Sequence, residues 1–516
     1  MYQSLLNRRY LTSKIMPLLS LVAVMLSTGT ILVTWSVMGG FLKTLMESGR
    51  TLIGDVAITW PNAGFAHYDD LIARLEREPE VAAATPIIET FGMIRLPDDQ
   101  LQAVSIRGVD GASFDRVTGY AGTLFWKPLD KPTPKDRNRK DLRLPEHTDP
   151  AFLEQVYHNG LTLSRDDGTG PEPAVVPGIE LTGLNQRQPS GVYTPMTSMR
   201  PTADGQIDVK NIFMPRNGSL TLTLLAIDSN GRFADAVTRR FPVANEFQSG
   251  IYDADSQIVL ARLDALQTML NMDEAQKTEP GNPFDTTIDP ETGEEVPALP
   301  RVVGVEPARV TSVLVRASDG VDSWALRAVC SRVYGLFASA HRDQVPSEFS
   351  IVIRTWQEKN ATLISAVEKE TGLVLFIFGI VCFTNVFLVL SIFWSMVSEK
   401  TKDVGILRAL GAGQLGIAWL WLRYGLLIGV VGSVLGVAMA YVIVRNINPI
   451  HDWIGATTGI VIWDPTVYYF IEVPNDMNWL HAGFVFAAGV LTCLIGAAIP
   501  ATRAARMDPV KALRFE

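Results

Sequence analysis

The sequence predicts a membrane α-helical protein with four transmembrane helices and a large extracytoplasmic α+β domain inserted between the first helix and the second. Two observations support this. Of the 516 residues, 47% are hydrophobic, and they gather near the N-terminus and after residue 370. Between these regions, short strand-like and helix-like stretches alternate, as in a folded domain outside the bilayer.

Four apolar runs are long enough to cross a bilayer, which takes about 20 helical residues. They are approximately Ile15–Met38, Leu373–Val397, Ile417–Val444 and Leu480–Ala498. The first run is longer than the ~7–15-residue core of a signal peptide, and no Ala-x-Ala cleavage site follows it. We therefore expect a retained helix, with a cleaved signal as the less favoured alternative.

Lysine and arginine near the span ends predict the orientation, because these residues are enriched on the cytoplasmic side. The N-terminal segment, the link between spans two and three, and the C-terminal tail are basic: Arg8, Arg9, Lys14, Lys400, Lys402, Arg408, Arg503, Arg506, Lys511 and Arg514. The link after span three carries only Arg445, against Asp452, Asp464, Glu472 and Asp476. Both termini are thus expected in the cytoplasm, and the insert on the far side.

These patterns divide the chain into nine consecutive parts. We expect a cytoplasmic segment (1–14), the first span (15–40), an exported α+β domain (41–365) and a stalk end with the second span (366–398). A charged cytoplasmic helix (399–414), the third span (415–444), an exported loop (445–477), the fourth span (478–499) and a cytoplasmic tail (500–516) follow.

Within the insert, periodicity predicts several elements. Strands are expected at Asp55–Trp60, Gln102–Arg107 and Ser219–Ile227, and helices at Tyr68–Arg77 and Arg262–Leu270. A third helical stripe, expected to face the core, comprises Val321, Trp324, Ala325, Ala328 and Val329. The segments 127–150 and 273–300 each hold five prolines and many charges, and we expect exposed loops there.

The sequence lacks the motifs of several classes of enzyme. It contains no G-x-x-x-x-G-K-[ST] loop for ATP, no H-E-x-x-H motif and no G-x-S-x-G elbow. The six histidines are scattered without Cys/His pairing, so no metal site is expected. Of three cysteines only Cys330 lies in the insert, which excludes an intramolecular disulfide there. The net charge of −9 gives no indication of nucleic-acid binding.

Three features in or next to the spans suggest that helices pack closely there or that movement is transmitted along them. Asn385 is a polar residue in the middle of span two, where it could bond across a helix interface or simply pack. Gly425, Gly429, Gly432 and Gly436 form two G-x-x-x-G pairs in span three that would let another helix approach closely, in a bundle or a permease dimer. Residues 354–370 lack proline and could extend span two outward as a helical stalk.

The segment 399–412 is charged and amphipathic, and it lies between two spans. Val404, Leu407, Leu410 and Leu415 can form one apolar stripe, with the charged residues mainly off it. Gly405 and Gly411 allow close approach or a turn. The pattern indicates a helix presented to a partner, and an ordinary helix lying on the headgroups is the alternative.

This segment resembles the link after the second span in ABC transporter permeases of the FtsX/MacB superfamily. The chain end, Pro500–Glu516, is similar to the C-terminal signature of that family, whose members also have four spans and a MacB-like periplasmic domain. Thr355–Asn360, Asn385 and Val467–Pro474, together with Arg9–Leu11 and Ser36–Phe41, resemble the lipoprotein-releasing LolC/LolE type. The resemblance is diffuse in the insert, where Phe247–Asp255 matches best.

The resemblance implies a permease subunit of the bacterial inner membrane that works by mechanotransmission and has no catalytic residues or cofactor of its own. ATP and magnesium would be held by a cytoplasmic ABC ATPase dimer. The residues that the resemblance assigns to ATPase coupling are Glu399, Lys400, Asp403, Gly405, Ile406, Leu407, Arg408 and Gly411, and those assigned to the stalk are Trp356 and Asn360. On this basis Gly405→Asp or Leu407→Asp should abolish ATPase docking without unfolding the exported domain.

The implied cargo is a lipoprotein, taken from the outer leaflet and passed to a periplasmic carrier. Further partners would be membrane lipid and a second permease chain, either identical or different. Three alternatives remain: a MacB-like efflux or secretion driver, an FtsX-like regulator of cell-wall hydrolases, and a membrane-anchored sensor.

Overall fold

The structure is a computed structural model, and it describes residues 15–50, 52–61, 63–97, 99–128, 149–166, 168, 170–187, 193–195, 197–201, 207–211, 213–227, 233–278, 286–288, 295–297, 302–459, 463 and 473–513. Contacts divide the chain into two units. The helical unit comprises Met1–Thr44, Thr362–Asp464 and Phe470–Glu516, and the sheet unit comprises Leu45–Ala361 and Pro465–Tyr469.

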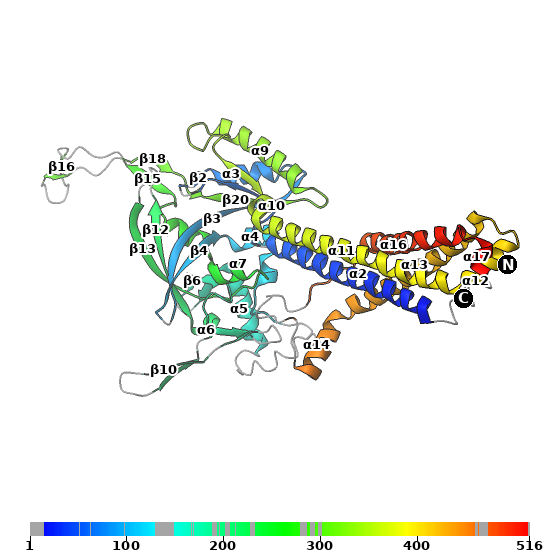
Figure 1. The fold of residues 1–516 in the computed structure, drawn as a ribbon. Helices are drawn as coiled ribbons and strands as arrows, with labels where there is room; N and C mark the ends of the chain where they lie inside the picture. The colour runs from blue at the N-terminus through cyan, green and yellow to red at the C-terminus, as the bar shows by residue number, and fades with distance from the viewer. Residues whose placement is uncertain are drawn as a thin grey trace. The chain divides into compact units, whose positions relative to one another are not determined.

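Four long helices run alongside one another in the helical unit (Figure 1). They are α2 (Ile15–Arg50), α11 (Ala361–Glu399), α13 (Gln414–Arg445) and α16 (Trp479–Ala505). Each is long and apolar enough to cross a membrane, over Leu18–Thr44, Ile364–Glu399, Gln414–Arg445 and Trp479–Ala505. Shorter helices follow them: α12 (Thr401–Ala409), α14 (Ile447–Thr458) and α17 (Pro509–Leu513).

All four long helices contribute to a buried apolar cluster, which includes Val24 of α2, Phe393 of α11, Ile428 of α13 and Cys493 of α16. Because lipid is as apolar as these side chains, close packing and not the hydrophobic effect holds such helices together.

The sheet unit is built around a nine-stranded, mostly antiparallel sheet. Its main path is β21 (Val352–Thr355), β1 (Val56–Thr59), β20 (Ser312–Ala317), β3 (Val81–Arg95), β4 (Leu101–Val109), β14 (Ile258–Arg262) and β7 (Val175–Pro177). Only the pair β4 and β14 is parallel among the pairs of this sheet that the structure describes. The far half of β3 pairs instead with β12 (Ser219–Ile227), which pairs with β13 (Phe233–Pro242).

Apolar side chains alternate between two cores on opposite faces of this sheet. Val56 and Ile58 of β1 face a core with α3 (Tyr68–Leu75), α8 (Leu263–Met269) and α9 (Ser323–Ala340). Ala57 faces a second core with α4 (Gly111–Thr118), in which Phe114 is fully buried. The period of two is that of a sheet covered on both faces.

The remaining elements of the sheet unit are short. The two-stranded pairs are β2 (Phe65–Ala66) with β19 (Arg309–Val310), β5 (Ser164–Asp166) with β6 (Pro171–Pro173), β8 (Asn185–Arg187) with β9 (Tyr193–Pro195), β10 (Thr197–Pro201) with β11 (Ile207–Asn211), β15 (Ala275–Thr278) with β18 (Val302–Glu306) and β16 (Thr286–Ile288) with β17 (Glu295–Pro297). The short helices are η1 (Tyr120–Thr123), α5 (Pro150–Thr162), α6 (Met214–Asn217), α7 (Tyr252–Gln257) and α10 (Trp356–Lys359).

The expected strands near residues 55–60, 102–107 and 219–227 are confirmed as β1, β4 and β12. The expected helices near 68–77 and 262–270 are confirmed as α3 and α8. The basic segment 1–14, most of the proline-rich loop 127–150, parts of 273–300, Val467–Glu472 and the last residues 514–516 lie outside the described residues.

One expected core stripe is wrong for three of its five residues, because only Val321 and Val329 pack against the core. Trp324 is 51% exposed and Ala325 and Ala328 are also exposed, whereas Leu326, Cys330, Val333, Tyr334 and Phe337 of α9 are buried. Two apolar stripes share this helix, and the one with the larger side chains faces the core. Trp324 instead lies against the guanidinium of Arg327, at 5.7 Å from the ring centroid.

The expected stalk is also shorter than predicted. Residues 352–355 form the edge strand β21, and Trp356–Lys359 form the separate turn α10. The long helix begins only at Ala361, after Asn360, whose φ of −104° and ψ of 21° interrupt the helix.

Candidate functional site

The predicted coupling segment folds as a short helix between two long ones. Helix α11 ends at Glu399, and α12 follows from Thr401 after a break at Lys400. The Lys400 ammonium lies 3.0 Å from the Asp403 carboxylate, one turn further on. This ion pair therefore stabilises the first turn of α12, whether or not the two side chains also contact a partner.

A tight turn links α12 to α13, and it explains two of the predicted residues. Gly411 has a φ of +92°, a conformation that a residue with a Cβ adopts only with strain. The Arg408 guanidinium donates to the backbone oxygen of Ala412 at 3.3 Å and so closes the turn. Arg408 and Gly411 thus position the segment.

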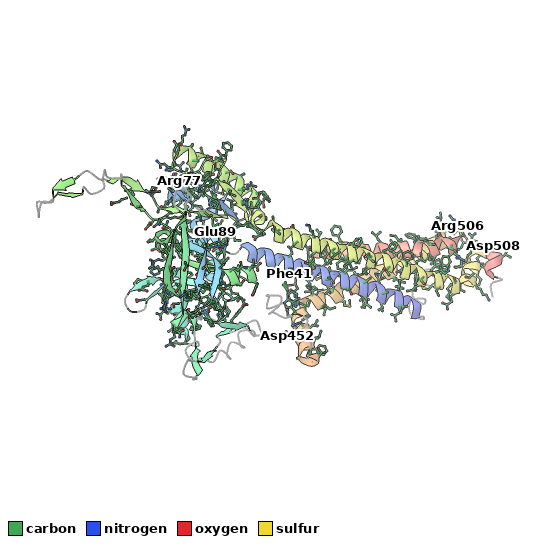
Figure 2. The ribbon with its side chains drawn as sticks, turned by 60° about the vertical axis from the view of Figure 1, so that its left-hand side comes forward. Phe41, Arg77, Glu89, Asp452, Arg506 and Asp508 are labelled. Atoms are coloured by element: carbon green, nitrogen blue, oxygen red, sulfur yellow. The ribbon has the colours of Figure 1, made fainter. Side chains whose placement is uncertain are left out.

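One side of α12 is buried against other helices of the same unit. Val404 is 3% exposed and packs with Val397, Ile417, Ala504 and Ala505, and Gly405 is also buried. The α12 helix contacts α17, and Figure 2 shows Arg506 and Asp508 where α16 ends and α17 begins. The ends of α11 and α16 are joined as well, because the Arg503 guanidinium lies 4.1 Å from the ring centroid of Trp394.

The opposite side of α12 is exposed and partly apolar. Ile406 is 49% exposed and Leu410 is 80% exposed, and Lys402 is exposed one turn before Ile406. Residues four apart lie on one side of a helix, so Lys402, Ile406 and Leu410 form a surface that we call the coupling face.

The single apolar stripe expected from Val404, Leu407, Leu410 and Leu415 is not present. Val404 faces inward, Leu407 is half-buried, and Leu410 faces solvent. Leu415 belongs to the next helix, α13, where it is 87% exposed. Glu399 is exposed at the end of α11, and Asp403 is half-buried.

The four glycines of α13 lie where two other helices cross it. A Cβ on Gly425 or Gly429 would come within 2.9 Å of Ala497 Cβ or 3.0 Å of Cys493 Cβ, both on α16. A Cβ on Gly432 or Gly436 would come within 3.1 Å of Val24 Cβ or 2.7 Å of the Met25 oxygen, both on α2. The first G-x-x-x-G pair therefore contacts α16, and the second contacts α2 within the same chain.

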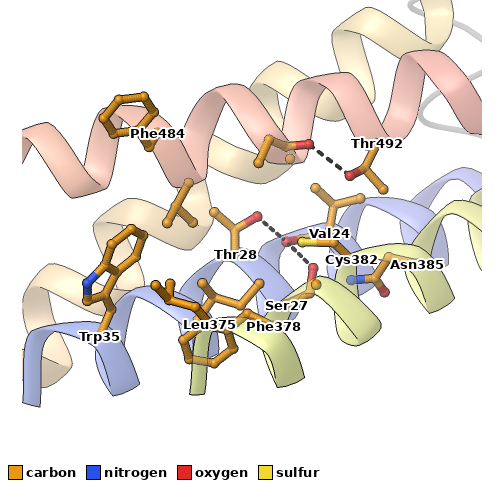
Figure 3. Close-up of a pocket in the computed structure, with 15 residues that line it drawn as sticks. Val24, Ser27, Thr28, Trp35, Leu375, Phe378, Cys382, Asn385, Phe484 and Thr492 are labelled. Carbon is orange, nitrogen blue, oxygen red and sulfur yellow. Dashed lines mark hydrogen bonds between the residues drawn. The ribbon is translucent and has the colours of Figure 1, made fainter. Parts of the chain in front are cut away.

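Asn385 lines a cavity of about 330 Å³ between α2, α11 and α16 (Figure 3). Most of the lining is apolar, including Trp35, Leu375 and Phe378. The hydroxyls of Ser27, Thr28 and Thr492 donate to carbonyl oxygens of their own helices, at 3.1, 2.7 and 2.8 Å. Within the described part of the chain, the Asn385 amide, the Trp35 indole N–H and the Cys382 thiol of the lining have no hydrogen-bond partner.

The two predicted stalk residues anchor the strand–turn segment that precedes α11. Trp356 is 4% exposed, and its backbone N–H donates to the Asp55 oxygen at 3.0 Å. The Asn360 amide donates to the Trp356 oxygen at 3.1 Å.

Sequence reasoning missed the residues that fix this turn. Thr355 and Glu358 form a capping box, in which each side chain accepts from the backbone N–H of the other. The Arg327 guanidinium lies 2.7 Å from the Glu358 carboxylate. The T-x-x-E pattern at 355–358 was a readable signal for this cap.

Comparisons with known proteins show which proteins this chain resembles. Residues 375–509 match the family described as FtsX-like permease C-terminal. The lipoprotein-releasing system transmembrane protein LolC of Xylella fastidiosa (strain 9a5c) is 21% identical over 498 residues, which is 96% of this chain and 93% of that protein. The LolE protein of Haemophilus influenzae is 27% identical over 27% of this chain and 32% of its own.

One further relative and one solved structure carry the name MacB. The macrolide export ATP-binding/permease protein MacB of Escherichia coli is 26% identical over 42% of this chain and 29% of its own length. The solved periplasmic region of MacB from Actinobacillus actinomycetemcomitans aligns with 63% of this chain and 97% of its own, at 11% identity and a TM-score of only 0.26. From its sequence matches, the chain carries an FtsX-like permease domain, and its relatives are permeases of the FtsX/MacB superfamily, LolC and LolE among them.

Proposed function

We propose that this chain is the permease subunit of an ABC transporter that extracts lipoproteins from the outer leaflet of the inner membrane and transfers them to a periplasmic carrier. The observation that carries the proposal is the similarity to LolC over 96% of the chain. In this proposal, α2, α11, α13 and α16 are the spans, and both termini lie in the cytoplasm.

The coupling face is the proposed docking surface for a separate ATPase. Exposed apolar side chains rimmed by polar residues mark protein interaction sites, and the chain has no P-loop of its own. ATP and magnesium would be bound by the ATPase, so ATP hydrolysis reaches this chain only as a mechanical force on α12.

The buried side of α12 supports transmission of that force. Because Val404 packs with residues of α11, α13 and α16, α12 cannot shift alone without breaking this packing. Helix α11 continues without interruption from Glu399 back to Ala361. The adjoining turn α10 is held in the sheet unit by the buried Trp356 and by the Thr355–Glu358 cap. We propose that this continuous path carries the movement to the exported domain.

The cavity between α2, α11 and α16 is the proposed entry for a lipid chain. It is apolar, and the inward hydroxyls are already hydrogen-bonded to their own helices. An acyl chain could therefore enter without displacing bound water from those hydroxyls. Helix α11 also presents many exposed apolar side chains, such as Phe376 and Phe383 at 68% and 64%, which membrane lipid or a second permease chain would cover.

A MacB-like driver of efflux or secretion is the second candidate, favoured by the match to MacB over 42% of the chain. The two candidates differ in cargo and in partner. A lipoprotein-releasing permease responds to a lipid-anchored protein, whereas an efflux driver requires an adaptor and an outer-membrane channel.

Purification of the full chain from its own membrane tests the proposal. We expect an ATPase to co-purify, and its turnover to rise with an acylated lipoprotein but not with the deacylated form. Absence of any co-purifying ATPase would rule out the transporter, and stimulation by both forms would rule out lipoprotein release.

The docking surface is tested separately with Ile406→Asp and Leu410→Asp, which should each reduce ATPase recovery at least about tenfold, since a charge in an apolar interface costs more than 1.4 kcal/mol. The matched control is Phe349→Asp in the sheet unit, where Phe349 is 98% exposed. Equal recovery in all three variants would place the docking surface elsewhere.

A further inference from the structure

The sheet unit contains a charged cleft that the proposed transport mechanism does not use. Its volume is about 320 Å³. Glu89 on β3 and Arg107 on β4 are register partners on one face of the sheet, and Lys359 reaches the same point from α10. Figure 2 labels Glu89 on the sheet.

The three charges form a triad with one carboxylate and two cations. The Arg107 Nε lies 3.3 Å from Glu89 Oε1, and the Lys359 Nζ lies 3.0 Å from the same oxygen. Burial raises the pKa of Glu89, but the charges of Arg107 and Lys359 outweigh this and leave the pKa below its usual value. Glu89 is therefore ionised at neutral pH. It is the only acid among the described residues that line the cleft, and these residues together carry one net positive charge.

Arg107 has a buried hydrogen-bond donor that lacks an acceptor. Its side chain is only 9% exposed, and one terminal nitrogen donates to the Leu52 oxygen at 3.0 Å. The Arg107 Nε is buried, and its N–H does not point at the Glu89 carboxylate well enough to form a hydrogen bond. In the described structure this N–H therefore has no acceptor. A buried donor of a charged group without an acceptor costs roughly 1–3 kcal/mol or more, and an anion in the cleft would remove that cost.

The cleft also offers a hydroxyl and an apolar wall. Ser105 lies beside Arg107 on β4, and its hydroxyl makes no hydrogen bond to any described residue. Phe91, the register partner of Ser105 on β3, is 83% exposed. Leu270 and Met272 also line the cleft.

The apolar surface continues along the sheet away from the charges. Met93 follows Phe91 on the same face of β3 and is 45% exposed, and Leu101 on β4 is 59% exposed. The strip ends at Arg95, the exposed register partner of Leu101. Side chains two apart on a strand share a face, so a polar cleft passes into an apolar strip.

We propose that this cleft binds the anionic group of an amphipathic molecule, with Arg107, Lys359 and Ser105 on the anion and Phe91 on the apolar part. A phosphate or carboxylate with one acyl or alkyl chain has the required chemistry. The net charge, the buried N–H and the adjoining strip each match one part of such a ligand. The site is independent of ATPase docking and of the cavity between the long helices.

The test is calorimetric titration of the full chain in phosphatidylcholine nanodiscs with four ligands: hexyl phosphate, inorganic phosphate, hexanol and an acidic peptide. We expect hexyl phosphate to bind at one site per chain, inorganic phosphate about tenfold more weakly, and hexanol not at all. Inorganic phosphate binding as tightly as hexyl phosphate would overturn the amphipathic ligand. An acidic peptide binding more tightly than hexyl phosphate would also overturn it, in favour of a protein partner.

Four variants locate the site. Lys359→Gln should weaken hexyl phosphate binding about tenfold, the loss expected for one charge-assisted hydrogen bond, and Arg107→Gln should weaken it at least as much. Glu89→Gln should strengthen it, because the cleft then carries two uncompensated cations. Phe91→Ala should weaken hexyl phosphate but leave inorganic phosphate unchanged.

Because Arg107 is buried and its replacement could impair folding, the decision rests on Lys359→Gln and Glu89→Gln. If these two variants do not shift the affinity in opposite directions, the triad is structural only and the proposal is wrong.

Discussion

Val56 and Thr355 are register partners in the neighbouring antiparallel strands β1 and β21. Along the chain, β1 comes soon after α2 ends at Arg50, and β21 comes soon before α11 begins at Ala361. The segments that continue into two of the long helices are thus joined by strand pairing inside the sheet unit. Trp356, Thr355 and Glu358 secure the same place from the side of α11.

This pairing predicts that β1 and β21 move together during the transport cycle. Ala57 and Arg354 are directly opposite each other, so cysteines at both positions can form a disulfide without large backbone movement. We expect the ATPase that co-purifies with the oxidised Ala57→Cys/Arg354→Cys chain to be stimulated by substrate as strongly as with the reduced form. Loss of stimulation on oxidation, recovered on reduction, would show that the two strands must separate.

The glycines of α13 predict a packing defect when they are enlarged. A Cβ on Gly436 would lie 2.7 Å from the Met25 oxygen, a backbone atom that cannot turn away. Gly436→Val should therefore lower the free energy of unfolding by roughly 1–3 kcal/mol, the usual cost of overpacking. Thermal unfolding of the purified chain measures it. Gly416→Val is the matched control on the same helix, because nothing lies within 4 Å of its Cβ position.

Much of the architecture could be read from the sequence because its signals are strong and local. The four apolar runs predicted helices that the structure extends at their ends, as in Trp479–Ala505, which continues past Pro500. Strand β12 has the bounds that the alternation predicted. The glycine spacing in α13 indicated close approach, although it could not say that two different helices share the four positions.

The remaining differences depend on three-dimensional context. Two stripes of α9 have helical spacing, and only the fold decides that Leu326 and Phe337 face the core while Trp324 does not. The stripe through Leu410 and Leu415 looked continuous because periodicity cannot show that the chain turns at Gly411. Val404 and Leu410, six residues apart, do not share a side of a helix. The charged triad of Glu89, Arg107 and Lys359 joins residues about 270 positions apart, and no local pattern predicts such a contact.

Burial of Gly405 changes what its substitution tests. Gly405 lies on the packed side of α12, whereas Ile406 is 49% exposed. Both Gly405→Asp and Ile406→Asp should reduce ATPase recovery, but only Gly405→Asp should also loosen α12, because a carboxylate in the cluster around Val404 is buried without a partner. Limited trypsin digestion near Lys400 and Lys402 separates the two. Faster cleavage of both variants would mean that Ile406 also supports the fold.

Glu246 predicts a pH-dependent stability of the sheet unit. It is fully buried, and its two carboxylate oxygens accept from the indole N–H of Trp126 and the amide of Asn185, each at 2.8 Å. Burial raises the pKa of Glu246 from 4.5 to about 7, although both hydrogen bonds act in the opposite direction. The folded state therefore retains a proton that the unfolded chain has already lost between these two values.

This difference in protonation sets the direction in which stability changes with pH. The contribution of Glu246 to the free energy of unfolding is greatest below pH 4.5, falls as the pH rises toward about 7, and is constant above that. The total loss is on the order of 3 kcal/mol, from about 1.4 kcal/mol per unit of pKa difference. Glu246→Gln cannot ionise, so its melting temperature should fall less between pH 5 and pH 8 than that of the unchanged chain. Glu172→Gln, at an exposed position of β6, is the control. If the melting temperature of Glu246→Gln falls as much between pH 5 and pH 8 as that of the unchanged chain, other groups cause the pH dependence.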